Sequence, residues 1–217
     1  GYEQMAIWDE SSLPALLDFV DETGEPGPRF WADGTYPQGE DNLPVVGVSW
    51  YEALAYARWA GKRLPTDAEW VKAGTWPVES SPGCLTQRRY PWGDAYDAAR
   101  ANVWGSGPGK PVAVDRYKGG MSVGGSCQLI GNVWEWTASG FGDPDDPTLR
   151  LPKPMKAIRG GAFDTYFESQ ATCHFQSGDS LLARKHNIGF RLAIGICDLA
   201  AEATGLLDSS ADQLVDA

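Results

Sequence analysis

The sequence predicts a mixed domain of the α+β class with little regular secondary structure. Two short helices are indicated by paired capping residues, Ser49 with Glu52 and Thr66 with Glu69. From Trp76 onward, Gly, Pro, Asp, Asn and Ser recur every few residues, and the apolar runs between them are short. Such a segment cannot build a helical bundle or a doubly wound parallel sheet, so we expect short strands joined by long loops.

The two helices should cover about residues 51–59 and 67–73, because apolar residues recur at helical spacing in both. The connection at 62–65 is too short for anything but a sharp turn. We therefore expect the helices to pack side by side and to bury Trp59 and Trp70.

The other predicted elements are short. Residues 11–20 are typical of a small amphipathic helix with Ser11 or Ser12 as its cap, and residues 21–42 are predicted to form an ordered loop. The candidate strands are brief apolar runs bounded by turn-forming residues, at 44–48, 111–114, 127–130, 133–137, 156–159 and 190–196.

Length and charge narrow the class of protein. A chain of 217 residues is expected to hold one domain, which we place at 1–197, followed by an acidic, Ala-rich tail at 198–217. The net charge of −11 disfavours binding to nucleic acid and to anionic membranes. No apolar run approaches the roughly 20 residues of a spanning helix, and no signal peptide opens the chain, so we predict a cytoplasmic protein.

The thiols and imidazoles match no metal motif. The four cysteines, at positions 84, 127, 173 and 197, form no CxxC pair, and free thiols are the expectation. His174 and His186 share a segment with Cys173, but their spacing fits no metal site, so surface or packing roles are predicted.

Five stretches follow one another between residues 44 and 191: PVVGVSW, GKRLPTDAEW, YPWGD, GNVWEWT, and RGG paired with GFR. In this order they resemble the formylglycine-generating enzyme family, of the sulfatase-modifying-factor type. The resemblance covers about residues 45–192 and implies a decorated fold similar to that of C-type lectins.

The GNVWEWT and RGG stretches also carry a physical expectation. On a strand, Trp134 and Trp136 share one face while Glu135 points to the other. A carboxylate in so aromatic a segment needs a partner, and Arg159 and Arg191 are candidates to pair with buried acids. We assign structural roles to all five residues.

The resemblance implies copper(I) chemistry, but this chain lacks the two cysteines that would bind the copper. In the family, two cysteines five residues apart follow the RGG motif and hold the copper that oxidises a substrate cysteine to formylglycine. The matching positions here are Thr165 and Gln170, or Phe163 and Glu168 if the count starts from Gly189. Neither pair contains a thiol, so copper is not expected.

The resemblance also implies calcium sites, which are only partly kept. Gln128 stands where an acid is common in the family, which removes a charge from a site for a hard cation. Asn102 and Glu135 remain as candidate calcium ligands.

The family usually begins with a Gly-rich apolar region well before the counterpart of residue 1. We therefore expect another chain, or an upstream segment, to complete the fold. The ligand or protein partner itself is not identified by the sequence.

From the missing thiols we predict a non-catalytic recognition domain. Its binding surface would lie in 163–187, between the rigid RGG and GFR elements. The side chains expected to line a shallow groove there are Asp164, Thr165, Tyr166, Phe167, Gln170, His174, Phe175 and Gln176.

Two alternatives stay open. One is an oxidoreductase of the formylglycine-generating type or of the sulfoxide-synthase type, in which the resemblance implies an iron site on a separate upstream domain. The other is a variable binding protein of a diversity-generating retroelement.

Overall fold

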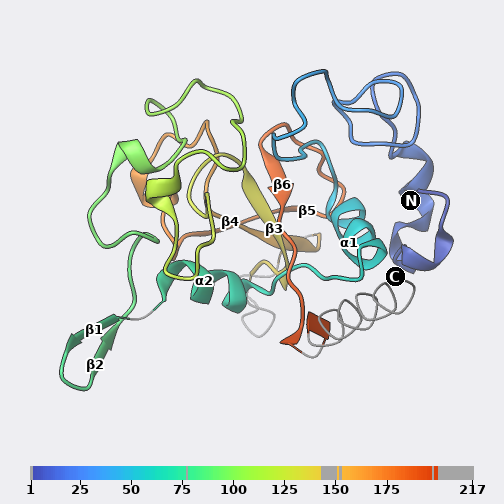
Figure 1. Cartoon of the computed structure of the whole chain (residues 1–217). Coiled ribbons are helices and arrows are strands. Elements are labelled where there is room, and N and C mark those ends of the chain that lie inside the picture. Colours follow the sequence, from blue (N-terminus) through green and yellow to red (C-terminus); the bar gives the residue numbers. More distant parts are fainter. Residues whose placement is uncertain (1, 77, 143–150, 152, 197, 200–217) are drawn as a thin grey trace, which may run out of the picture.

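The structure is a computed structural model that describes residues 2–76, 78–142, 151, 153–196 and 198–199. It confirms an α+β domain with little regular structure (Figure 1). Most of the predicted tail, residues 200–217, lies outside the described residues. The helices are η1 (Met5–Ile7), η2 (Glu10–Asp18), α1 (Trp50–Trp59), α2 (Asp67–Thr75), η3 (Ala98–Arg100), η4 (Lys118–Gly120) and η6 (Glu168–Gln170), where η marks a 3-10 helix.

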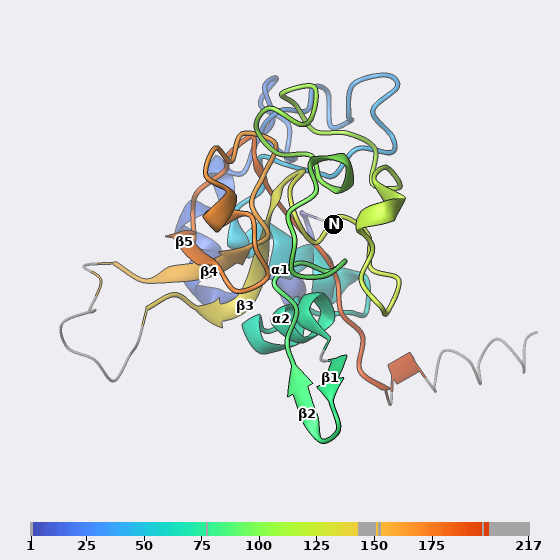
Figure 2. The same cartoon turned by 90° about the vertical axis from the view of Figure 1, so that its left-hand side faces the viewer.

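Six strands are present among the described residues, in two sheets. The larger sheet has the order β5-β4-β3-β6, with β3 antiparallel to β4 and parallel to β6. A separate hairpin of β1 and β2 projects from the body of the domain (Figure 2). The strands are β1 (Val78–Ser81), β2 (Cys84–Thr86), β3 (Trp134–Gly140), β4 (Met155–Arg159), β5 (Gln176–Ser180) and β6 (Ile188–Phe190).

Strand β3 lies between two hydrophobic cores. Trp136 is fully buried in the first core, together with Trp50 of α1. Glu135 points to the opposite face, where its carboxylate accepts a hydrogen bond of 2.7 Å from the indole N–H of Trp70, a residue of α2 in the second core. The alternation of β3 that the sequence predicts is therefore confirmed.

Both predicted helices are confirmed, and each has its complete capping box. Their packing differs from the prediction, because α1 belongs to the first core and α2 to the second. Trp70 is buried, but Trp59 is 54% exposed. Helical spacing predicts an apolar face but not which neighbour will cover it, and in the last turn of α1 Ala57 is fully buried whereas Trp59 is not.

The N-terminal helix is more tightly wound than predicted. Residues Glu10–Asp18 form a 3-10 helix, and Asp9 rather than a serine is the cap, because its carboxylate accepts a hydrogen bond from the backbone of Ser11. Pro14 has no N–H to donate to the carbonyl four residues before it, which disfavours an α-helix here.

Several predicted strands are irregular segments instead. Residues 44–48, 111–114 and 127–130 form no strand, and of 190–196 only Phe190 belongs to one. Gly47 and Gln128 have φ of 72° and 52°, which an extended strand cannot contain. Strands β1, β2 and β5 were not predicted, because they contain too few apolar residues to show a strand pattern. No described helix is long and apolar enough to cross a membrane.

Two ion pairs hold the sheet to its surroundings. The guanidinium of Arg191 donates to both oxygens of Glu135, at 2.5 and 2.6 Å. The guanidinium of Arg159 donates to both oxygens of Asp67 at the start of α2, at 2.6 and 2.5 Å. Glu135 and Arg159 are buried and Arg191 is half-buried, so all three have the polar partners that the sequence led us to expect.

Replacing Arg159 with alanine should lower the free energy of unfolding by roughly 3–5 kcal/mol, because it leaves the Asp67 carboxylate without its partner. Urea unfolding measures this loss. Arg63→Ala is the matched control, since its pair with Glu69 is 44% and 45% exposed and should contribute about 1 kcal/mol or less. Equal losses for the two variants would contradict the assignment.

Candidate functional site

The end of β4 fixes the start of the candidate site. Gly160 and Gly161 follow the strand with φ of 95° and 77°. A side chain at Gly160 would meet the carbonyl oxygen of Leu129 at 2.5 Å, so glycine is required by close approach as well as by φ. The backbone N–H of Gly131 then donates to the carbonyl of Gly160 at 2.8 Å. These contacts set where the chain leaves the sheet.

The first family copper position is part of the next turn. The hydroxyl of Thr165 accepts a hydrogen bond of 2.8 Å from the backbone of Ala162, and the backbone of Thr165 donates to the carbonyl of Ala162 at 2.9 Å. Thr165 is buried, and Gln170 lies in the short helix η6. Neither side chain is a soft ligand, and the Thr165 hydroxyl already serves the backbone.

A pocket of about 550 Å3 opens beside this turn. We call it the aromatic pocket. Its walls come from the loops at 30–46 and 109–111 and from two residues near the ends of the sheet. Its aromatic lining residues are Phe30, Trp31, Tyr36 and Phe163, and its charged or titratable ones are Glu40, Asp41, Lys110 and His186.

A polar cluster lies at one wall of the aromatic pocket. The amide of Asn187 donates to both carboxylate oxygens of Asp164, at 3.2 and 3.0 Å, and so fixes their orientation. The imidazole of His186 lies 3.8 Å from the same carboxylate and packs against the ring of Phe163, with centroids 5.7 Å apart. The wall therefore offers a carboxylate and an imidazole on a rigid base.

Three exposed rings continue the site beyond the pocket. Trp104, Tyr166 and Phe167 are 59%, 69% and 60% exposed. Their ring centroids lie 6.3 Å apart for the first pair and 5.2 Å for the second. We call these three residues the exposed aromatic patch. They belong to the segments around 104–111 and 163–167, which also line the aromatic pocket.

The loop that carries Trp31 and Tyr36 is held by Asp21. Its carboxylate accepts hydrogen bonds from the backbone of Thr23, Glu25 and Gly34, at 2.8, 3.0 and 2.8 Å. Burial alone would raise the pKa of Asp21, but these bonds and the Thr23 hydroxyl lower it to about 2. The loop is therefore ordered by one ionised side chain.

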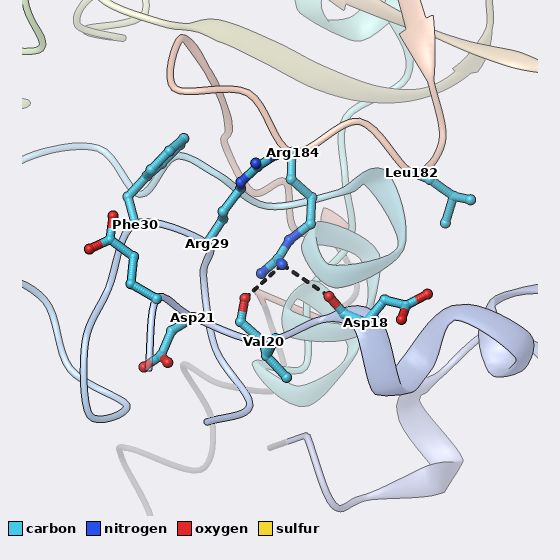
Figure 3. Close-up of a pocket in the computed structure, with 8 residues that line it drawn as sticks. Asp18, Val20, Asp21, Arg29, Phe30, Leu182 and Arg184 are labelled. Carbon is cyan, nitrogen blue, oxygen red and sulfur yellow. Dashed lines mark hydrogen bonds between the residues drawn. The ribbon is translucent and has the colours of Figure 1, made fainter. Parts of the chain in front are cut away.

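Arg184 ties the same loop to the segment that carries His186. Its guanidinium donates to the carbonyls of Val20 and Gly27, at 2.8 and 2.5 Å, and to the carboxylate of Glu52 on α1 at 3.0 Å. Figure 3 shows this side chain reaching toward the backbone at Val20 and Asp18, in a separate pocket that Asp21 and Phe30 also line. One cation, whose side chain is 9% exposed, thus joins the loop, helix α1 and the segment that carries His186.

The eight side chains predicted to line one groove are not brought together. Asp164, Tyr166 and Phe167 lie at the site described above, whereas Thr165 is buried in its turn. His174 faces Gln87 on the other side of its segment. None of the eight lines the aromatic pocket, to which their neighbour Phe163 contributes. The remaining three, Gln170, Phe175 and Gln176, are half-buried.

The pocket walls were missed by sequence reasoning, although a signal was present. Phe30, Trp31 and Tyr36 place three rings in a loop otherwise rich in Gly, Pro and acidic residues. Aromatic side chains in such a loop need either a core or a ligand to cover them. The sequence does not show that this loop returns to the segment at 163–186.

The described cysteines are not candidates for a reactive centre here. Cys173 is buried against Gly74, and burial raises the pKa of its thiol to about 12. It therefore stays a protonated, unreactive thiol at neutral pH. Cys127 is half-buried and free. Cys197 lies outside the described residues, and so does the Cys84 side chain.

Comparison with known proteins identifies relatives over most of the described chain. Residues 14–196 match the model of the Sulfatase-modifying factor enzyme 1-like domain. The chain is 42% identical to the hercynine oxygenase of Mycolicibacterium thermoresistibile over 147 residues, which cover 64% of this chain and 31% of that protein. It is 44% identical to the formylglycine-generating enzyme of Thermomonospora curvata over 180 residues, covering 70% and 55% of the two chains.

A solved structure shows the same fold. PvdO from Pseudomonas aeruginosa superposes with a TM-score of 0.53 over 72% of this chain and 63% of that chain, at 22% identity. This likeness concerns the fold alone. The chain spans about a third of the length of the hercynine oxygenases it matches.

These relatives overturn the prediction of a non-catalytic recognition domain. Three hercynine oxygenases, which are enzymes, are 37% to 42% identical to this chain. The absence of a thiol pair at the matching positions therefore does not by itself make this a binding domain. The similarity favours the oxidoreductase alternative instead.

Because its folded-state pKa is depressed, Asp21 should stabilise the protein above about pH 4, and this contribution should fade as the pH falls from about 4 towards 2. Asp21→Asn should therefore melt at a lower temperature than the wild type at pH 6, with a gap that narrows towards pH 3. Thermal melts over this range measure it. Asp33→Asn, in the same loop and exposed, should show no gap. A constant gap for Asp21→Asn would contradict the role of its charge.

Proposed function

The chain belongs to the sulfatase-modifying factor enzyme 1-like family, and from this we propose that it is part of an oxidoreductase of the sulfoxide-synthase type. The observation that carries the proposal is the 42% identity to a hercynine oxygenase in a chain with no thiol at the matching copper positions, which are Thr165 and Gln170 or Phe163 and Glu168. In this proposal the aromatic pocket binds the substrate that is oxidised.

Formylglycine generation is the second candidate, favoured by the 44% identity to an enzyme that carries this name. It requires two thiolates for copper(I), and a hydroxyl and a carboxamide do not replace them. The Thr165 hydroxyl is also engaged with the backbone of Ala162. The site therefore supports this candidate less well than the first.

Iron is the metal that the sulfoxide-synthase resemblance implies, and the described residues do not fit it. The whole chain has two histidines, His174 and His186, and no group of three His, Cys, Asp or Glu side chains converges within the described ranges. In this proposal, another segment or another chain holds the iron. Such a partner must approach the substrate, and the exposed aromatic patch beside the aromatic pocket is suited to that contact.

The chemistry of the aromatic pocket indicates the class of substrate. Aromatic faces attract an organic cation, and the carboxylates of Glu40 and Asp41 add to that attraction. Asp164, held by Asn187, places a third carboxylate beside the pocket, 3.8 Å from the imidazole of His186. A substrate with a cationic group fits these surroundings, and hercynine, named for the relative, is the substrate we propose, with the imidazole of His186 available as a hydrogen-bond partner.

Removing one ring should weaken substrate binding without unfolding the protein. Tyr36 is 45% exposed and lines the aromatic pocket. We expect Tyr36→Ala to weaken the binding of hercynine about 5- to 30-fold, which corresponds to a cation–π interaction of about 1–2 kcal/mol. Isothermal titration calorimetry measures the dissociation constant.

Tyr56→Ala is the matched control, because Tyr56 is 48% exposed and lines a different pocket. It should bind hercynine as the wild type does. Equal weakening in both variants would contradict the placement of the substrate, and a wild-type protein that binds no hercynine would contradict the proposed substrate.

A second outcome separates the two candidate reactions. With copper(I) supplied, a peptide that carries the Cys-x-Pro-x-Arg sulfatase motif should keep its cysteine, because the thiolate pair is missing. Mass spectrometry detects conversion to the aldehyde, and the formylglycine-generating enzyme of Thermomonospora curvata serves as the positive control. Conversion by this chain would support formylglycine generation instead.

A further inference from the structure

Two of the three positions at which the family resemblance concerns calcium meet in one small pocket. Gln128 and Glu135 both line a cavity of about 280 Å3 at the start of β3. Arg191 and Asn132 line it as well. Whether these side chains offer free oxygens to a cation decides if calcium fits here.

The carboxylate of Glu135 is already saturated with donors. Arg191 donates to both of its oxygens, and Trp70 donates to one of them at 2.7 Å. An arginine guanidinium is charged at any physiological pH, and its positive charge repels a divalent cation from the same carboxylate.

Gln128 presents a donor to the oxygens that surround it. Its amide nitrogen donates to the carbonyls of Ala113 and Arg116, at 2.7 and 3.0 Å. Its side-chain oxygen accepts a hydrogen bond from the amide of Asn132. Carbonyl oxygens are typical ligands of calcium, but here an N–H group occupies their lone pairs.

Asn132 and Asn102 extend the same network. The amide of Asn132 donates to the carbonyl of Val112 at 3.0 Å, and that of Asn102 donates to the carbonyl of Lys110 at 3.0 Å. The side-chain oxygen of Asn102 is buried and lacks a hydrogen-bond partner. It is a single neutral oxygen, whereas calcium takes 6–8 oxygen ligands.

We propose that this pocket takes no calcium ion, because the Glu135–Arg191 ion pair and the Gln128 carboxamide already engage its polar groups. The guanidinium neutralises Glu135, and the carboxamide holds the loop at 113–116 against the turn that leads into β3. The domain therefore folds and keeps this loop in place without calcium.

The melting temperature of the full chain, followed by circular dichroism in EGTA and then in excess calcium chloride, tests the proposal. The wild type should melt at the same temperature in both. If the dissociation constant for calcium were about 100-fold below the added concentration, the melting temperature would rise by roughly 5–10 °C. Such a gain with calcium, but not with magnesium, would overturn the proposal.

The variant Gln128→Ala tests whether the carboxamide stabilises the fold, which the absence of calcium binding alone would not show. It should lower the melting temperature by roughly 5 °C or more, equally in EGTA and in calcium, because the buried amide of Asn132 loses its acceptor and two carbonyls lose their donor. Gln38→Ala, an exposed amide in a loop, is the control and should melt as the wild type does. An unchanged melting temperature for Gln128→Ala would also overturn the proposal.

Discussion

The buried carboxylate of Glu135 is the constraint on which the rest of the fold depends. It lies on the central strand and accepts from Trp70 of α2 and from Arg191, which directly follows β6. These bonds join the second core to β3 and to the segment that follows β6. A charge placed in so apolar a setting is stable only when each donor is present, so it also dictates which strand neighbours β3.

The loops that build the aromatic pocket lie outside this rigid frame. The aromatic pocket is built by loops at 30–46 and 109–111 that no strand pairing fixes. Asp21 and Arg184 replace strand pairing with hydrogen bonds from side chains to backbone. Residues that touch a ligand therefore stand on loops, and residues that hold those loops stand behind them.

The helices could be predicted because their signals are local. Ser49 and Thr66 each cap a helix through a glutamate three residues later, and both partners are visible in the sequence. Strand β5 could not be predicted, because Gln176–Ser180 is polar and is extended only through its pairing with β4. The same holds for the aromatic pocket. Tyr36 and His186 both line it, although 150 positions separate them in the sequence, and no local pattern indicates that they lie in one pocket.

Thr165 shows how one side chain can be committed to the backbone. Its hydroxyl closes the turn after Gly161 by accepting from the backbone of Ala162, a task for which sulfur is a weak acceptor. A cysteine at this position would add a thiol and at the same time loosen the turn that positions it. A metal-binding thiolate and a firmly closed turn therefore make opposite demands on this position.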